Sequence, residues 1–329
     1  MFTEQSLRDH PSLVKAFMGI SAEQFWELIE MMTSHVASST HTPPQRSDRM
    51  RAVGGGRVYT HSLALRTALV LTYLRLHIPQ ATVAALFGAD QSDVSRELRR
   101  LLPLIQICLP CPLVWEVVAD DQVVPATSCL SLDDLAEGRV LIDATEQRVS
   151  RPHDSVEQKA HYSGKKHGFT LKTQFVTDGQ HHIEAISSAQ PGASHDKALS
   201  DQVRTLERLP DGCEADADKG YQGLAAQVSV TSVRDPQSGT TAHVPRLTVQ
   251  TPFKKPKGGE LSDEQRAFNR ALGTIRIRIE HCIGWAKNWA ILATRFRCDH
   301  AIYTPIMRTI CGLVNVQTAR WQAAKANCA

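Results

Sequence analysis

The chain has 329 residues, of which 42% are hydrophobic, and a formal net charge of only +3. This length allows two domains, or one large domain with an appendage, and a sizeable core. No run of about 18 apolar residues occurs, and the first residues lack the basic-then-apolar order of a signal peptide, so we expect a cytoplasmic protein without a membrane span.

Charge is distributed unevenly along the chain. Residues 43–57 carry four Arg and one acid, and residues 266–297 carry seven Lys or Arg and one acid, Glu280. Local basic surfaces on a nearly neutral protein are compatible with phosphate binding, and equally with solvated helix faces. The eight Cys lie mostly alone in apolar contexts, which favours reduced, buried thiols over a zinc site.

The first 102 residues have a helical pattern. Residues 1–40 are predicted to be helical, with a capping box formed by Ser21 and Gln24, and the Pro- and Gly-rich residues 41–60 are predicted to be a loop. An apolar-periodic helix follows at 61–77, and the chain then enters a helix, turn and helix at 79–102.

The turn in residues 79–102 has recognisable end signals. Gly88 can adopt the left-handed conformation that ends the first helix at Phe87, and Asp90 or Ser92 can cap the second. This is the helix-turn-helix layout, whose second helix enters the DNA major groove, although an ordinary helical hairpin has the same pattern. The side chains expected to reach DNA are Gln91, Ser92, Ser95 and Arg96. We therefore predict an all-α DNA-binding domain over residues 1–110.

The pattern changes to α/β after Gly138. Residues 111–137 are predicted to be a connector with a short helix, and residues 138–329 a catalytic domain. Strands are expected at 139–149, 167–179, 181–192, 213–218 and 246–252, with helices at 194–209, after Gln222, and at 261–290. This order predicts an α/β fold in which a mixed sheet is flanked by helices.

Acidic residues occur where these strands end. Asp143 follows three apolar residues within a strand, where a carboxylate is costly unless it is capped, paired with Lys172 on the next strand, or bound to metal. Asp218 ends another strand, and Glu280 lies on a helix face shared with Arg276 and Lys287. Two strand-end carboxylates and one helical carboxylate are the ingredients of a two-metal site that cleaves phosphodiesters.

Several motifs in this chain occur together in one known family. They are LIDATEQRV, YSGKKHGFTLKTQFVTD, PGASHDK, ADKGYQG, TPFKKPKGGEL and FNRALGTIRIRIEHCIGWAKNW, with GGGR, LTYLRL and LFGADQSDVSREL before them. Together they resemble the DDE transposases of bacterial insertion sequences, in particular the insertion-sequence-five group and its eukaryotic Harbinger relatives. The resemblance covers residues 50–329 and implies a ribonuclease H-like catalytic domain that nicks transposon ends and transfers the cut strands to target DNA.

The resemblance also implies roles for individual residues. Asp143, Asp218 and Glu280 match the three catalytic, metal-binding acids. Arg276 and Lys287 match DNA-contacting positions around the glutamate, while the Tyr expected there is replaced by Gly273. Asp196 is a further candidate metal ligand or a helix cap, so the second acid is either Asp218 or Asp196.

The remaining expectations concern partners. Lys165, Lys166 and Lys172 either contact DNA phosphates or form a solvated basic hairpin. The resemblance implies two magnesium or manganese ions, terminal inverted repeats and target DNA as partners, a homodimer or larger assembly on DNA, and association with the nucleoid. The predicted function is that of a DNA transposase. The alternatives are a catalytically inactive or domesticated DNA-binding regulator, and a metal-dependent nuclease without strand transfer.

Overall fold

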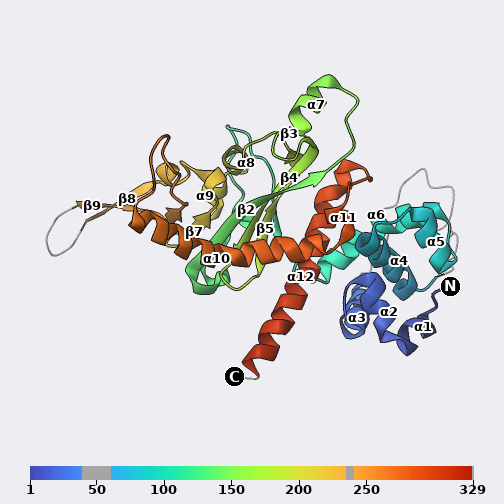
Figure 1. Ribbon diagram of the computed structural model, residues 1–329. Coiled ribbons are helices and arrows are strands. Elements are labelled where there is room, and N and C mark those ends of the chain that lie inside the picture. The colour runs from blue at the N-terminus through green and yellow to red at the C-terminus, as the bar shows by residue number, and fades with distance from the viewer. Residues whose placement is uncertain (39–60, 235–240, 328–329) are drawn as a thin grey trace. The chain divides into compact units, whose positions relative to one another are not determined.

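The computed structural model describes residues 1–38, 61–234 and 241–327, and the chain divides into two compact units (Figure 1). The first unit comprises Met1–Leu109 and Trp289–Ile291, and the second comprises Pro110–Asn288 and Leu292–Ala329. The basic residues 43–57, with the GGGR motif, lie outside the described residues. Within the described ranges, none of the helices has the length and apolar character needed to cross a membrane.

The first unit is built from helices around a central, buried helix, α4. The helices are α1 (Glu4–Asp9), α2 (Pro11–Met18), α3 (Ala22–Ser38), α4 (Leu63–Leu76), α5 (Gln80–Phe87) and α6 (Gln91–Ile107). α4 is buried on nearly all sides because α2, α3, α5 and α6 pack around it. The expected capping box at the start of α3 is present, since the Gln24 amide donates to Ser21 Oγ and the Ser21 amide to Gln24 Oε1.

The turn between α5 and α6 follows the sequence signals. Gly88 has a φ of 65°, in the left-handed region that favours glycine, and ends α5. Asp90 is the N-cap of α6 and forms a capping box with Asp93. α6 continues to Ile107, five residues past the expected end at 102, because its apolar face, including Leu101 and Ile105, remains buried.

The second unit contains one mixed sheet with the strand order β1-β5-β4-β2-β7-β10. These strands are β1 (Leu113–Trp115), β2 (Arg139–Arg148), β4 (Gly168–Asp178), β5 (Ile183–Ser187), β7 (Glu214–Ala217) and β10 (Thr248–Gln250), and the short strands β3 (Tyr162–Ser163) and β6 (Gln190–Pro191) pair with β4. β2, β4 and β5 are antiparallel neighbours, whereas β7 and β10 continue the sheet parallel to β2. This confirms the predicted mixed sheet.

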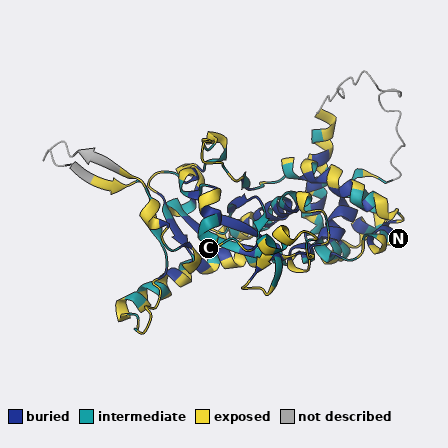
Figure 2. Ribbon diagram, turned by 90° about the horizontal axis from the view of Figure 1, so that it is seen from above, coloured by how far each residue is buried: buried dark blue, intermediate teal, exposed yellow. Residues whose placement is uncertain are grey.

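Helices lie on both faces of this sheet (Figure 1). They are α7 (Ser155–His161), α8 (Asp196–Gln202), α9 (Thr205–Arg208), α10 (Asp263–Lys287) and α12 (Tyr303–Ala326). A further helix, α11 (Ala290–Ala293), contains residues of both units. Val140 and Ile142 of β2 pack with Leu199 of α8 in one core, whereas Thr145 and Gln147 face α10 and α12 on the other side. Figure 2 shows buried residues in the strands of the sheet, as well as in the helices of the first unit. The two faces of β2 therefore see different neighbours.

The expected connector at 111–137 is wrong as a description of this segment. β1 pairs in parallel with β5, and Trp115 and Leu130 are buried in the core of the second unit. Arg208 fixes the segment through bonds to the Glu116 carbonyl and Ser128 Oγ. The single short helix is replaced by three 3-10 turns, η1 (Ala126–Ser128), η2 (Leu132–Asp134) and η3 (Ala136–Gly138).

Two predicted helices are also corrected. The helix at 194–209 is divided into α8 and α9, because Arg204 takes a left-handed φ of 50° between them. After Gln222 there is only a 3-10 turn, η5 (Ala225–Gln227), followed by a separate two-stranded ribbon, β8 (Val230–Arg234) and β9 (Thr241–Pro245). The valines and threonines of this ribbon favour strands over helix.

Candidate active site

Asp143 and Asp218 lie side by side at the point where β7 ends. Asp143 is in the middle of β2, paired with Phe175 of β4, and so is not at a strand end as the sequence analysis expected. Ile142 of β2 pairs with Ala217 of the parallel strand β7, and the two aspartates are the next residues of their strands. β7 ends there, and Asp218 becomes the N-cap of the 3-10 turn η4 (Lys219–Tyr221). The register of two neighbouring parallel strands therefore places two carboxylates side by side, although they are 75 residues apart in sequence.

Arg276 of α10 bridges these two carboxylates. Its Nη1 lies 3.1 Å from Asp218 Oδ1 and its Nη2 3.4 Å from Asp143 Oδ2. Arg276 is 7% exposed, and the Asp143 side chain is 20% exposed. A single cationic group thus occupies the space that the two acids share, in a partly dry setting where charge interactions are strong.

The electrostatics of Asp143 follow from this crowding. Burial raises the pKa of Asp143 to about 6, and the carboxylates of Asp218 and Asp196 push it in the same direction. The Ala144 amide, which donates to Asp143 Oδ1 at 2.7 Å, and Arg276 oppose that rise. The carboxylates of Asp143, Asp218 and Asp196 repel one another, and the Arg276 cation lies between the first two. Such a site favours added positive charge.

Asp196 is held in a different way from the other two acids. It is the first residue of α8, and its Oδ1 accepts a bond of 2.8 Å from Lys172 Nζ. Its Oδ2 packs so closely on η4 that a Cβ on Gly220 would lie 2.4 Å away. Asp196 therefore has a resident counter-ion of its own, whereas Asp143 and Asp218 share one.

Lys172 neither pairs with Asp143 nor belongs to a solvated hairpin. It lies opposite Glu146 in the β2–β4 register and is 3.8 Å from that carboxylate, rather than pairing with Asp143. Its ammonium group also donates to the Ser194 carbonyl at 2.5 Å, and the residue is 6% exposed. A buried lysine with three oxygen partners is a structural ion pair, so the expected DNA contact at Lys172 is not supported by its position.

Glu280 lies one turn after Arg276 on α10 and is exposed. No three His, Cys, Asp or Glu side chains in residues 1–38, 61–234 and 241–327 are grouped closely enough to hold a metal ion. The structure therefore brings together the first two predicted acids, with Arg276 between them, and leaves Glu280 facing solvent.

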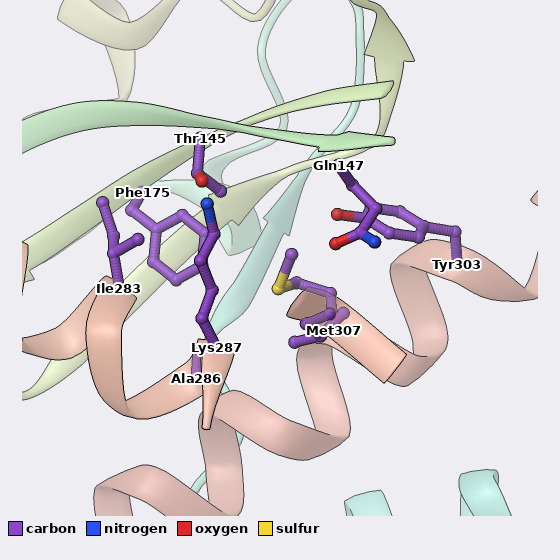
Figure 3. A pocket seen from close by; sticks show the side chains of 9 residues that line it. Thr145, Gln147, Phe175, Ile283, Ala286, Lys287, Tyr303 and Met307 are labelled. Carbon is purple, nitrogen blue, oxygen red and sulfur yellow. The ribbon is translucent and has the colours of Figure 1, made fainter. Parts of the chain in front are cut away.

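Lys287 reaches from the end of α10 toward β2. Figure 3 shows its amine beside Thr145, within a pocket that Gln147, Phe175 and Met307 also line. Burial lowers the pKa of Lys287, and Lys166 and Lys165 add to this, whereas Glu146 and Asp143 oppose it. Lys165 and Lys166 are exposed in the turn between β3 and β4. The three lysines are thus electrostatic neighbours near the strand that carries Asp143.

The candidate DNA-reading residues of α6 lie at its start. Gln91, Ser92 and Arg96 are exposed and Ser95 is half-buried. Gln91 Nε2 donates to Gln80 Oε1 of α5 at 2.5 Å, and Arg96 donates to Ser92 Oγ and to Asp93. Exposed pairs of this kind contribute little stability and are readily exchanged for other partners.

Tyr221 is a member of the site that the sequence analysis did not single out. It is fully buried at the end of η4, and its hydroxyl has no hydrogen-bond partner among the described residues. Burial raises the pKa of Tyr221, and Asp196, Asp143 and Asp218 add to the effect. The sequence feature that could have revealed Tyr221 is its position three residues after Asp218, because a short turn there cannot expose every side chain.

Asp143 and Asp218 offer the donor type that a divalent cation prefers, although no third acid, His or Cys of the described residues completes a metal-holding group with them. Carboxylate oxygens are the ligands that magnesium and manganese prefer, and Asp143 and Asp218 already share a cationic group. Arg276 Nε is buried without a partner, so the guanidinium is incompletely satisfied where it lies. Acids on neighbouring strands of a mixed sheet occur in the class of nucleases that work with divalent metal ions.

Comparisons with known proteins place the chain within that class. Residues 142–315 match the model of the DDE superfamily endonuclease, and the chain belongs to this family. A relative from Microchaete diplosiphon, described as "Probable transposase for insertion sequence element IS702", is 34% identical over 185 residues. That match covers 56% of this chain and 58% of the relative, so the chain spans less than two thirds of its length. No solved structure matches the chain.

Two glycines near the site predict opposite responses to alanine. A Cβ on Gly273 of α10 would meet no atom within 4 Å, so Gly273→Ala should raise the free energy of unfolding by about 0.5–1 kcal/mol through better helix propensity. Gly220→Ala should lower it, because the new methyl group would collide with Asp196. Urea unfolding of both variants checks the pair, and a stabilising Gly220→Ala would contradict the described packing of Asp196.

Proposed function

We propose that this protein is a DNA transposase that cuts the terminal inverted repeats of its element and joins the freed 3′ ends to target DNA. One observation carries the proposal. In a chain that belongs to an endonuclease family, Asp143 of β2 lies beside Asp218 at the end of the parallel strand β7, and the two acids share one cationic group. Magnesium-dependent nicking of a duplex carrying the element's own terminal repeat tests it, and intact duplex after incubation would contradict it.

Asp143 and Asp218 would hold the metal ions, with Glu280 completing the set. Two magnesium or manganese ions, when bound, supply the positive charge that stabilises the attacking and leaving oxygens of an in-line displacement at phosphorus. The chain's own part is to present carboxylate oxygens and to withdraw Arg276 from them. Once released, the Arg276 guanidinium is free to bind a phosphate, for which its planar donor fork is suited.

Basic groups around Asp143 support a path for the DNA strand. Lys165 and Lys166 are exposed, and their charges, like that of Asp143, act on the pKa of Lys287. Ammonium groups so placed would hold phosphates on either side of the scissile bond. Cleavage and joining are both displacements at phosphorus, so one set of residues would serve both steps.

The sheet supports the proposal of a ribonuclease H-like catalytic domain. Three antiparallel strands, β2, β4 and β5, are extended on the other side of β2 by β7 and β10, which run parallel to it. Residues 138–329 would form this domain together with β1. DNA transposition joins two element ends, so a homodimer or larger assembly on DNA at the nucleoid is part of the proposal.

The first unit is proposed to bind the terminal repeats through a helix-turn-helix. In the full-length chain, Arg96→Ala should weaken binding and reduce the slope of log affinity against log salt by about one, because one phosphate contact is lost. Gln91→Ala should instead reduce discrimination between repeat and unrelated DNA by about 1–3 kcal/mol. Gel-shift titrations at several salt concentrations measure both quantities.

Arg8 provides a matched control for this prediction. It is an exposed arginine of the same unit, paired with Glu4 on α1. Arg8→Ala should leave the salt dependence unchanged if α6 is the DNA-binding helix. An unaltered titration with Arg96→Ala and Gln91→Ala together would contradict the assignment and favour an ordinary helical hairpin.

A further inference from the structure

The loop between β10 and α10 leaves the sheet beside the end of β7, where Asp218 lies. β10 pairs in parallel with β7, and Gln250 lies opposite Asp216. Two residues farther along each strand are Pro252 and Asp218. Gln222, four residues after Asp218, donates to Thr251 Oγ1 at 3.0 Å and to the Pro252 carbonyl at 2.7 Å. The loop is therefore fastened to the turn that carries the second acid.

Phe253 is held in place by its backbone. Its amide donates to Asn269 Oδ1 at 2.8 Å, and its carbonyl accepts from Asn269 Nδ2 at 3.1 Å. Its ring makes an edge contact with Phe268, with centroids 5.2 Å apart at 67°. Despite this support Phe253 is 43% exposed. The backbone of Phe253 is fixed by two hydrogen bonds, yet its ring is open to solvent. The ring therefore has a free face and is not part of the core.

Basic residues lie close to Phe253 in the sequence, in the loop and in the first part of α10. Glu260 pairs with Lys255 and Asp263 with Arg266. Lys254, Lys257 and Arg270 are exposed, and no ion pair involves them in the described part of the chain. Exposed aromatic rings interleaved with basic side chains are the combination that binds single nucleic acid strands, through stacking of bases and neutralisation of phosphates.

We propose that Phe253 stacks on an unpaired nucleobase of the DNA strand next to the cleavage point, while Lys254 and Lys257 hold the flanking phosphates. Asn269 is a positioning residue that fixes the loop. This inference rests on the proposed function and adds to it a contact that orients the strand. The favoured ligand is DNA rather than a protein segment, because the loop is bonded to Gln222 after Asp218 and exposed lysines follow Phe253 directly in the sequence.

Fluorescence of a base analogue tests the stacking directly. The probe is a duplex with the element's terminal repeat and 2-aminopurine at the nucleotides flanking the cut, bound to full-length Asp143→Ala protein so that no cleavage occurs. Stacking on Phe253 should quench one of these positions. Phe253→Leu, which keeps an apolar contact with Phe268 but has no aromatic face, should remove the quenching, and Phe253→Trp should retain it.

Variants of the two lysines and of Asn269 should separate a loss of DNA binding from a loss of base stacking. Lys254→Ala with Lys257→Ala should weaken binding and flatten its salt dependence, yet leave the quenching at saturation unchanged. Asn269→Ala should reduce the quenching at saturation with little change in affinity, because the ring loses its fixed position. In protein with Asp143 intact, Phe253→Leu should slow cleavage about tenfold, the effect of losing one base–aromatic stack.

The outcomes distinguish this inference from the proposed function. Wild-type protein that cuts the repeat, combined with a Phe253→Leu protein that quenches and cuts equally well, would overturn the role of Phe253 alone. Loss of self-association in Phe253→Leu, with unchanged quenching, would likewise overturn it in favour of a protein contact. A wild-type protein that binds the repeat but never nicks it would instead count against the proposed function.

Discussion

Asp218→Ala should abolish metal-dependent cleavage of terminal DNA, with a loss of about a thousandfold or more. A metal ligand contributes through several kcal/mol of charge stabilisation at the reacting phosphate, and each 1.4 kcal/mol or so is a factor of ten in rate. Asp218 shares the Arg276 guanidinium with Asp143, and its side chain is 37% exposed, so it is open to a metal and to DNA. Single-turnover cleavage of end-labelled repeat DNA measures the loss.

Asp196→Ala is the matched comparison. Asp196 is already neutralised by Lys172 and packed on Gly220, so its removal should disturb the site indirectly, with a loss of about ten- to a hundredfold. Both variants should bind the repeat as wild type does. If the Asp218→Ala protein cuts normally and the Asp196→Ala protein does not, Asp196 is the second acid and the assignment made here is wrong.

Arg276→Met should destabilise the metal-free protein by about 3 kcal/mol, because removing one partner of a buried ion pair leaves the other charges uncompensated. Asp143 and Asp218 would then face each other without a cation. Magnesium should restore more stability to this variant than to wild type, since in wild type it must first displace the guanidinium. Urea unfolding with and without magnesium gives both increments through the linkage of binding to folding.

Arg278→Met is the control for that experiment. Arg278 lies two residues farther along α10, is 34% exposed, and contacts the Gly179 carbonyl and Glu137 rather than the aspartates. Its removal should cost less stability and leave the magnesium increment equal to that of wild type. Equal magnesium increments in Arg276→Met and wild type would show that Arg276 does not occupy the space of the metal.

Much of the catalytic half could be predicted from sequence because its signals are local. β2, β4 and α10 lie within a few residues of the expected ranges, since each has a long apolar pattern or a clear cap, such as Ser262 at the start of α10. The mixed sheet followed from the order of these elements. Of the two acids expected at strand ends, Asp218 follows the end of β7, whereas Asp143 lies inside β2 and is brought beside Asp218 by the pairing of β2 with β7.

The features that sequence analysis missed depend on contacts between distant segments. β1 has only three residues and is a strand because β5 offers it an edge to pair with. Lys172 is drawn to Asp196 and Glu146 by the register of β4, which no local pattern reveals. The bridge from Arg276 to Asp143 spans 133 residues and exists only once α10 crosses the sheet.

The proposed transposase function is tested most directly by one reaction in which both cutting and joining can be detected. Purified wild-type protein is incubated with magnesium, a labelled duplex carrying the terminal repeat, and a supercoiled plasmid as target. We expect nicked ends and plasmid-joined label with wild type. We expect neither product with Asp143→Ala or Asp218→Ala proteins that still bind the duplex. Joined product from the Asp143→Ala protein, or cut ends that wild type never joins, would contradict the proposed function.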